Sequence, residues 1–364
     1  VRQALVESGH VDAMVDIRSN FFYTRSVPCQ LWFLNKNKPE AHHDKVLMLD
    51  ARHVYRKVTR KIYDFSPEQL ANLTSIVWLY RGQSERFIEL VQSHIQNCLD
   101  HAWFAYELEY QQEGETITIQ PMDACIKVLA AIEEAITPFY QQQSPEQQGH
   151  LEEFSATLAT LSSDSTTYDK AIDKAVEYWQ QGVFASAKSL NPLIEQGGRV
   201  EQIAETSRDL IKQLDLAYKL AIRLIECAEK ELAAKVADNW ASKRISSGRD
   251  SLKKQADASR IEVVEQLKQV RYFYKQAHWL LSRFPDAQLV DVAGLVKLVA
   301  IEEIAANDWS LTPGRYVGVA PEEEDEDFDF EETLRDIHVE LQGLNEEAVG
   351  LAEKIAQNFR ELGV

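Results

Sequence analysis

Three consecutive aromatic residues, Phe21, Phe22 and Tyr23, form the strongest candidate for a chemical site in this sequence. Aromatic rings bury a large apolar area and stack on planar groups. The cluster therefore predicts either a stacking surface or a set of core aromatics at a turn between two strands. Arg18 and Arg25 flank the cluster. Both are candidates for contact with phosphate, and the alternative is that they are ordinary solvated side chains.

A second group of candidates is basic and lies between two segments with helical periodicity. It consists of Lys243, Arg244, Arg249, Lys253 and Lys254. In a chain with a formal net charge of -19, these residues form a local positive patch. These basic residues can be interpreted in two ways: they contact DNA phosphates or an acidic partner, or they are solvated side chains at the tip of a helical hairpin. The net charge argues against a chain that coats nucleic acid by itself, because DNA affinity depends largely on neutralising phosphates.

The sequence shows no pattern of metal ligands. His42, His43 and Asp44 are adjacent but have no third ligand at a suitable spacing, so we expect no metal site. The four cysteines, at positions 29, 98, 125 and 227, form no CxxC pair. We interpret them as buried thiols of a reducing compartment, which predicts a cytoplasmic protein.

The 364 residues provide room for two or three cores of ordinary domain size. A hydrophobic content of 45% with 27% charged residues is typical of a globular chain. No stretch approaches the roughly 18 apolar residues that a membrane span needs, so we expect none. No signal peptide and no initiator Met open the sequence, and we expect that it begins within a longer protein.

The first sixty residues alternate between helical and strand-like patterns. A short helix is expected at residues 1–8. Apolar-rich runs at Val11–Ile17, Cys29–Leu34 and Lys45–Asp50 predict three strands. Because helices normally cover a mostly parallel sheet, these strands are interpreted as the last part of an α/β sheet whose other elements lie upstream.

From Ser66 onward the pattern changes to long helices. Ser66 is a suitable cap, with Pro67 at the first helical position. Helices are expected at residues 67–77, 85–110, 151–161 and 168–181, with polar connectors at 141–148 and 162–167.

Two longer segments, at about 200–245 and 250–284, each carry a single apolar stripe. Ser246-Ser247-Gly248 separates them as a turn, which predicts a long antiparallel helical hairpin.

The end of the sequence has the most regular pattern. After a non-helical connector, Asn307–Pro321, and an acidic run, Glu322–Asp329, apolar residues step by three or four as in a coiled coil. The pattern predicts a helix whose apolar face packs on its own domain or, as we favour, against the helices of a partner. The expected interface residues are Leu334, Ile337, Leu341, Leu344, Leu351, Ile355 and Phe359.

Two regions of the sequence resemble one protein family. The segments VDAMVDIRSNFFYTRSVPCQLWFLNKNK (residues 11–38) and KVLMLDAR (residues 45–52) are similar to the stretch that follows the N-P-P-F/Y motif in N6-adenine DNA methyltransferases of type I restriction-modification systems. Near the other end, EEIAANDWSLTPGRYVG (residues 302–318) resembles that family's E-I-x-x-N-D-(W/Y)-x-L-x-x-x-R-Y-V signature. This second stretch has either a functional role or, as we favour, a structural one.

The resemblance implies the C-terminal portion of a modification subunit that transfers a methyl group from S-adenosylmethionine to adenine. Its implied partners are double-stranded DNA, a specificity subunit, a restriction subunit and a second modification subunit. An enzyme that acts on a base must flip it out of the duplex and hold it by stacking, and the resemblance assigns this contact to Phe22 and, second, to Tyr23.

The upstream motifs of the family, F-x-G-x-G for the cofactor and N-P-P-F/Y for the target amine, do not occur in this sequence. No catalytic residue is therefore assigned, and we expect this chain alone to be inactive.

The expected fold is an α/β remnant, the last strands of a Rossmann-like methyltransferase sheet, followed by a mainly α-helical region. The expected divisions are 1–62 for the end of the methyltransferase domain, 63–294 for the helical region with its hairpin at about 200–284, 295–329 for the connector, and 330–364 for a coiled-coil-like assembly helix. The alternative is a non-catalytic helical scaffold or adaptor, which the middle of the chain alone would also support.

Overall fold

The computed structural model describes residues 1–22, 26–59, 62–104, 108–112, 115–119, 121–180 and 190–320, together with residues 341, 348, 351, 352, 354 and 355. The chain divides into two units. Unit 1 consists of residues 1–69 and 290–364, and unit 2 consists of residues 70–289. A small mixed sheet and a mainly helical region are thus both present, as the sequence predicted.

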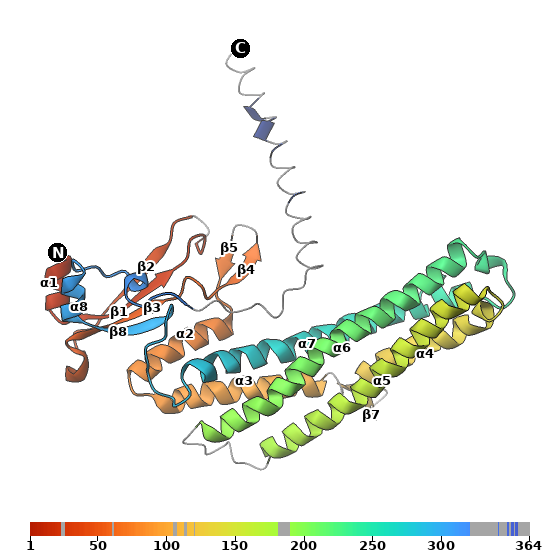
Figure 1. Ribbon diagram of the computed structural model, residues 1–364, viewed down its shortest axis with the longest axis horizontal. Coiled ribbons are helices and arrows are strands. Elements are labelled where there is room, and N and C mark those ends of the chain that lie inside the picture. Colours follow the sequence, from red (N-terminus) through yellow and green to blue (C-terminus); the bar gives the residue numbers. More distant parts are fainter. Residues whose placement is uncertain are drawn as a thin grey trace. The chain divides into compact units, whose positions relative to one another are not determined.

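Unit 1 is built on a four-stranded sheet with the order β2-β1-β3-β8 (Figure 1). β1 (Val11–Ile17) pairs antiparallel with β2 (Cys29–Leu34) and parallel with β3 (Lys45–Asp50). These three strands are confirmed with the bounds expected from the sequence. The fourth strand, β8 (Val296–Ala300), pairs antiparallel with the other edge of β3 and was not predicted.

The core of unit 1 combines residues from both ends of the described chain. Two short helices, α1 (Arg2–Glu7) and α8 (Ile301–Ala306), contact one another and supply buried residues to it. Alternate residues of a strand point to one face of a sheet, and Met14 of β1 and Met48 of β3 are neighbours across the ladder. The buried cluster comprises Val6, Val11, Met14, Val46, Met48, Val299, Ile304, Leu311, Tyr316 and Val317.

Three further short elements belong to unit 1. A two-stranded hairpin of β4 (Arg56–Thr59) and β5 (Ile62–Asp64) follows β3. The single turns η1 (Glu40–His42) and η4 (Pro313–Arg315) are 3-10 helical.

Unit 2 is mainly helical (Figure 1), and its first helix begins at Pro67, just before Leu70, where the unit starts. Ser66 caps the first helix as expected: its hydroxyl accepts a hydrogen bond from the Gln69 backbone N–H (3.1 Å), and the Gln69 side chain accepts one from the Ser66 backbone N–H (3.0 Å). The helices are α2 (Pro67–Tyr80), α3 (Ser84–Phe104), α4 (Pro121–Tyr140), α5 (Pro145–Gln180), α6 (Asn191–Lys230) and α7 (Leu252–Arg283).

The long helices α6 and α7 run antiparallel. Lys253, near the start of α7, forms an ion pair with Glu226 near the end of α6 (3.1 Å). Arg271, farther along α7, pairs instead with Glu205, earlier in α6 (2.9 Å). Later residues of α7 therefore pair with earlier residues of α6, as in two antiparallel helices.

The expected connector at residues 162–167 is wrong, because α5 passes through it without a break. Ser165 and Tyr168 lie on the buried side of this helix. The Thr166 hydroxyl donates to the carbonyl of Ser162 one turn earlier (3.0 Å), so polar side chains here bond to their own helix.

Two expected helix bounds are also wrong. α6 ends at Lys230, and the connection to α7 contains a 3-10 turn, η2 (Ala234–Val236), and a π-helical turn, η3 (Lys243–Ser247). α3 ends at Phe104, and a hairpin of β6 (Leu108–Gln112) and β7 (Glu115–Ile119) follows. In the part of the chain that the structure describes, no helix is long and apolar enough to cross a membrane.

The turn before β8 provides a test of how tightly residues 290–320 pack within unit 1. Gly294 and Gly318 both have positive φ, +72° and +74°, where an L side chain costs about 1 to 2 kcal/mol. A Cβ at Gly294 would lie 2.4 Å from the backbone nitrogen of Ala320, whereas a Cβ at Gly318 would meet nothing within 4 Å. We expect Gly294→Ala to reduce the free energy of unfolding by about 1 to 3 kcal/mol more than Gly318→Ala does. Equal losses in denaturant titrations of the two variants would contradict this packing.

Candidate functional site

Three polar residues, Gln30, Asp16 and Asp50, form one row across β2, β1 and β3, at the carboxyl ends of the parallel strands β1 and β3. Asp16 and Asp50 are buried. Asp50 accepts two parallel hydrogen bonds from Arg52, from Nε to Oδ1 (2.9 Å) and from Nη2 to Oδ2 (2.6 Å). Because open α/β sheets gather functional groups at the carboxyl ends of their strands, we take this edge as the candidate site.

The segment Leu311–Tyr316 covers this edge of the sheet. The Gln30 side-chain amide donates to the Thr312 hydroxyl (3.3 Å), across 282 positions of sequence, and the Gly314 backbone N–H donates to Asp16. A Cβ at Gly314 would lie 2.5 Å from Nη2 of Arg52. A larger residue at position 314 would therefore displace the end of the Arg52 side chain.

The same segment is packed internally. The Tyr316 hydroxyl is buried and donates to the carbonyl of Ser310 (2.7 Å). Leu311 and Val317 lie in the core of unit 1. The stretch Asn307–Tyr316 thus has the contacts of a structural element, which is the role favoured from the sequence.

Asp16 is the most perturbed carboxyl group at this edge. Burial raises its pKa above the ordinary value of 3.8, while hydrogen bonds from Gln30 and Gly314 oppose the rise. The negative charge of Asp50 raises the pKa further, and Arg52 lowers it. Burial has the largest effect, so the ionised form of Asp16 costs folding free energy.

The aromatic loop begins directly after β1. Asn20 has a positive φ of 61°, and its carbonyl accepts a hydrogen bond from the Tyr63 backbone N–H (3.1 Å). The ring of Phe21 packs on Phe65, with 4.4 Å between centroids. Phe22, in contrast, is 45% exposed. Phe21 is therefore an anchor and Phe22 is presented to solvent, so the interpretation of all three rings as core residues fails for Phe22; Tyr23, like Arg25, lies outside the described residues.

Arg18 lies between two aromatic rings of the region that follows β3. Its guanidinium carbon is 3.7 Å from the centroid of Tyr55 and 3.8 Å from that of Tyr63. Such cation–π contacts hold the planar group in one orientation. Arg18 is therefore not a freely solvated side chain, as one interpretation of the sequence had it.

The other predicted site residues belong to different regions of the chain. In unit 2, Lys243 and Arg244 lie on η3 and are exposed, as are Arg249 and Lys254. Lys253 is paired with Glu226.

In the terminal segment, Leu341, Leu351 and Ile355 are helical and exposed by 53%, 61% and 48%. Leu334, Ile337, Leu344 and Phe359 lie outside the described residues. Over the described ranges of the chain, no three His, Cys, Asp or Glu side chains are grouped so that they could hold a metal ion.

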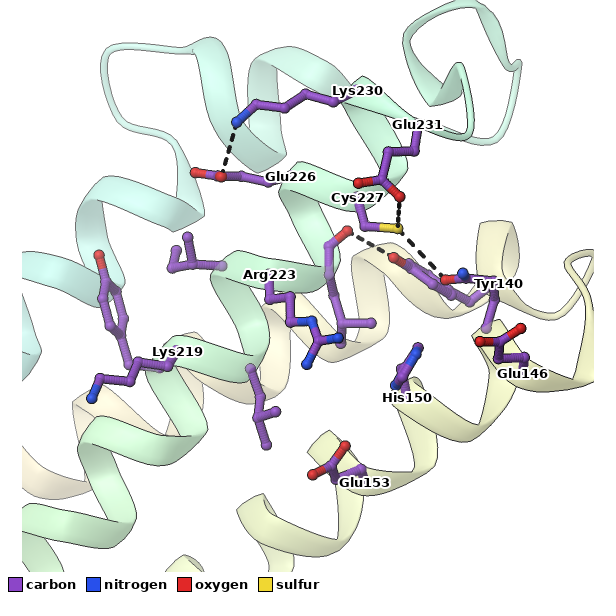
Figure 2. Close-up of a pocket in the computed structure, with 15 residues that line it drawn as sticks. Tyr140, Glu146, His150, Glu153, Lys219, Arg223, Glu226, Cys227, Lys230 and Glu231 are labelled. Carbon is purple, nitrogen blue, oxygen red and sulfur yellow. Dashed lines mark hydrogen bonds and ion pairs between the residues drawn. The ribbon is translucent and has the colours of Figure 1, made fainter.

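A hollow of about 620 Å³ in unit 2 is lined by side chains of α4, α5 and α6 (Figure 2). The Cys227 thiol donates to Glu231 (3.5 Å), and burial and this carboxylate raise its pKa. A thiol with a raised pKa is a poor nucleophile. Glu226 and Lys230 at the rim form an ion pair (3.0 Å). Neither the thiol nor this ion pair is an activated group, and we keep the sheet edge with its aromatic loop as the candidate site.

Sequence reasoning missed Asp16, Asp50, Arg52 and Gly314. The available signal was an Asp at the end of each of two apolar runs, Val11–Ile17 and Lys45–Asp50. Gly314 is remote in sequence from Asp16 and Asp50, so no local pattern connects these three residues.

Comparisons with known proteins match the beginning of the chain. A family model described as N-6 DNA Methylase matches residues 1–97. The type I restriction enzyme MjaIX methylase subunit of Methanocaldococcus jannaschii is 34% identical over 61 residues, which cover 17% of this chain and 11% of that protein. The type I restriction enzyme HindI methylase subunit of Haemophilus influenzae is 38% identical over 73 residues, 20% of this chain and 16% of that protein. No solved structure gives a significant match.

The raised pKa of Asp16 predicts a pH-dependent effect of Asp16→Asn, which keeps the size of the side chain but cannot ionise. Since the folded-state pKa lies above the unfolded value of 3.8, the stability contributed by this group is present at low pH. It is lost as pH rises through the folded pKa. The melting temperature of the variant relative to wild type should therefore be more favourable at pH 7 than at pH 4. If the melting temperature of the variant relative to wild type is constant with pH, or most favourable at pH 4, burial does not raise the pKa of Asp16.

Proposed function

We propose, from the match of residues 1–97 to the N-6 DNA Methylase family model, that the complete protein is the modification subunit of a type I restriction-modification system. It transfers a methyl group from S-adenosylmethionine to the N6 amine of adenine in double-stranded DNA. It works with a specificity subunit that reads the DNA, a restriction subunit and a second modification subunit.

The observation that carries this proposal is the exposed ring of Phe22 at the carboxyl end of β1. Its neighbour Phe21 is fixed on Phe65, so the loop presents one ring and anchors the other. A flipped adenine is held in such enzymes by stacking on aromatic or apolar side chains. In our proposal Phe22 is that contact, and Tyr23 follows it in the same loop. The scaffold alternative would need only unit 2, and it leaves this loop without a role.

A Rossmann-like sheet is supported by the exposed strand β2. Leu31, Trp32, Phe33 and Leu34 of β2 are 39% to 57% exposed, although the strand is apolar at successive positions. A strand with apolar residues on both faces is typical of the buried interior of an α/β sheet, and an open apolar edge favours pairing with another strand. We propose that β2 is an interior strand of a larger methyltransferase sheet.

The described residues at the carboxyl ends of β1 and β3 do not fit a site for S-adenosylmethionine. Leu311–Tyr316 covers this edge, with Gly314 in close contact with Arg52, and the sequence holds neither F-x-G-x-G nor N-P-P-F/Y. The aligned segments span only 11% and 16% of the relatives' own lengths. Cofactor binding is therefore proposed for the complete protein, with residues outside this chain.

This chain alone should neither bind S-adenosylmethionine nor methylate DNA, because it lacks both motifs. Isothermal titration calorimetry of the 364-residue chain with the cofactor is expected to show no heat of binding. Saturable binding at one site per chain would overturn this division of roles.

Phe22→Ala in the complete subunit should lower the rate of adenine methylation by roughly ten- to a hundredfold, because stacking of a base on an aromatic contributes about 1 to 3 kcal/mol. Phe22→Trp, which keeps a stacking surface, should retain most of the activity. Melting temperatures should match wild type, since Phe22 is exposed. Equal methylation by wild type and Phe22→Ala would remove Phe22 from the site.

We propose that the terminal helix binds the helices of a partner subunit through its apolar face. Leu341 and Leu351 are helical and largely exposed, and burying a leucine contributes roughly 1.5 to 3 kcal/mol. Leu341→Glu with Leu351→Glu should therefore abolish co-purification with the specificity subunit while helical content stays unchanged. Survival of the complex would place the contact elsewhere, and unfolding of the subunit would assign this apolar face to its own core.

A further inference from the structure

The β4–β5 hairpin has two faces of different charge. Arg56 lies opposite Asp64 in the ladder, and the two form a bidentate ion pair (2.9 and 2.8 Å). Lys57 lies opposite Tyr63, and residues directly opposite one another in an antiparallel pair share a face. This second face is the one whose Tyr63 ring contacts Arg18. Charge is therefore neutralised on the first face and retained on the second.

Neither Arg18 nor Lys57 forms an ion pair with a carboxylate among the residues that the structure describes. Lys57 is exposed. Arg18 is held by two rings, and its buried Nε has no hydrogen-bond partner. Among the described residues, this face thus carries two cations, of which Arg18 contacts aromatic rings and Lys57 is exposed.

The sequence around this face contains basic but no acidic residues. From position 51 to position 63 it contains no Asp or Glu, in a chain that has 58 of them. Arg60 and Lys61 continue the run and lie outside the described residues. Because a chain with a net charge of -19 repels polyanions overall, such a local positive surface decides where phosphates approach.

The hairpin is joined directly to the aromatic loop. The Tyr63 backbone N–H donates to Asn20, Phe65 packs on Phe21, and the stacked Arg18 begins the loop. Exposed Phe22 follows within the same few residues. The cations of the hairpin and the stacking ring are therefore parts of one local structure.

We propose that this face of the hairpin, through Arg18 and Lys57, binds the phosphodiester backbone of the DNA strand that carries the target base. The inference rests on the proposed function and deepens it by naming a backbone contact beside Phe22. The two tyrosine rings orient the Arg18 guanidinium, whose planar fork matches phosphate geometry, and Lys57 supplies a flexible point charge. An acidic protein would satisfy the same charges, but the adjacent exposed aromatic ring favours a nucleic acid.

The experiment uses the complete protein with the subunits that co-purify with it. Dissociation constants for a DNA duplex that contains the recognised site are measured at several KCl concentrations. Each phosphate contact contributes about 0.9 to the slope of log K against log salt. We expect Lys57→Gln to reduce the magnitude of that slope by about 0.9, and Arg18→Gln with Lys57→Gln by about 1.8. Lys57→Arg should keep the wild-type slope.

Lys36→Gln is the matched control. Lys36 is also an exposed lysine of unit 1, but it lies in the turn after β2, next to Asn35, whose backbone N–H bonds to the residue before β1. It is thus at the amino end of β1, whereas the hairpin follows the carboxyl end of β3. This variant should show the wild-type slope. Melting temperatures of all variants show whether a change in the salt slope reflects a loss of folding. Because Lys57 is exposed, Lys57→Gln should keep the wild-type melting temperature.

Methylation by the wild-type preparation is measured in parallel, so that the two proposals can fail separately. If wild type methylates DNA and Lys57→Gln keeps the wild-type slope, the backbone contact is wrong and the proposed function stands. If Lys57→Gln instead loses a co-purifying subunit at an unchanged slope, the face binds an acidic protein and the inference is overturned. If wild type methylates no DNA, the proposed function itself fails.

Discussion

The antiparallel pairing of β8 with β3 holds together two parts of the chain that are separated by the whole of unit 2. Without β8, the edge of β3 would be open, and the core would lose the buried side chain of Val299. The core contains Met14 and Met48 from the first segment and Val299, Ile304 and Val317 from the second. Burial of apolar area is the main favourable contribution to folding, and here neither segment buries its apolar residues alone.

The geometry of the candidate site depends on that pairing. β8 leads through α8 to the segment that places Gly314 over Arg52 and Asp16. The aromatic loop follows the carboxyl end of β1, and the β4–β5 hairpin follows the carboxyl end of β3. Both depend on one sheet edge, where Arg52 bonds to Asp50, Gln30 and Gly314 bond to Asp16, and Tyr63 and Phe65 hold the aromatic loop. A rigid edge of this kind suits a loop that must present one ring, because preorganised contacts lose less entropy on binding.

Much of the fold follows from local sequence patterns. The three runs that became β1, β2 and β3 are short, apolar and bounded by turn residues, and Ser66-Pro67 marks a helix start by its capping chemistry. Phe21 and Phe22 are the same residue type in opposite environments, so no local pattern predicts which of the two is exposed. The five residues of β8 carry no period that separates a strand from a helix, and their partner is decided by a non-local contact. Ser and Thr favour turns, so the local pattern of residues 162–167 predicts a connector, yet tertiary packing of Leu161 and Tyr168 keeps the helix continuous.

Residues 290–320 complete the sheet on which the site is built. Native-state hydrogen exchange of the whole chain, compared with a chain that ends at residue 289, tests it directly. The backbone amides of β1 and β3 should lose their protection in the shorter chain while the helices of unit 2 keep theirs. Unchanged protection of β1 and β3 after removal of β8 would show that the sheet does not depend on residues 290–320.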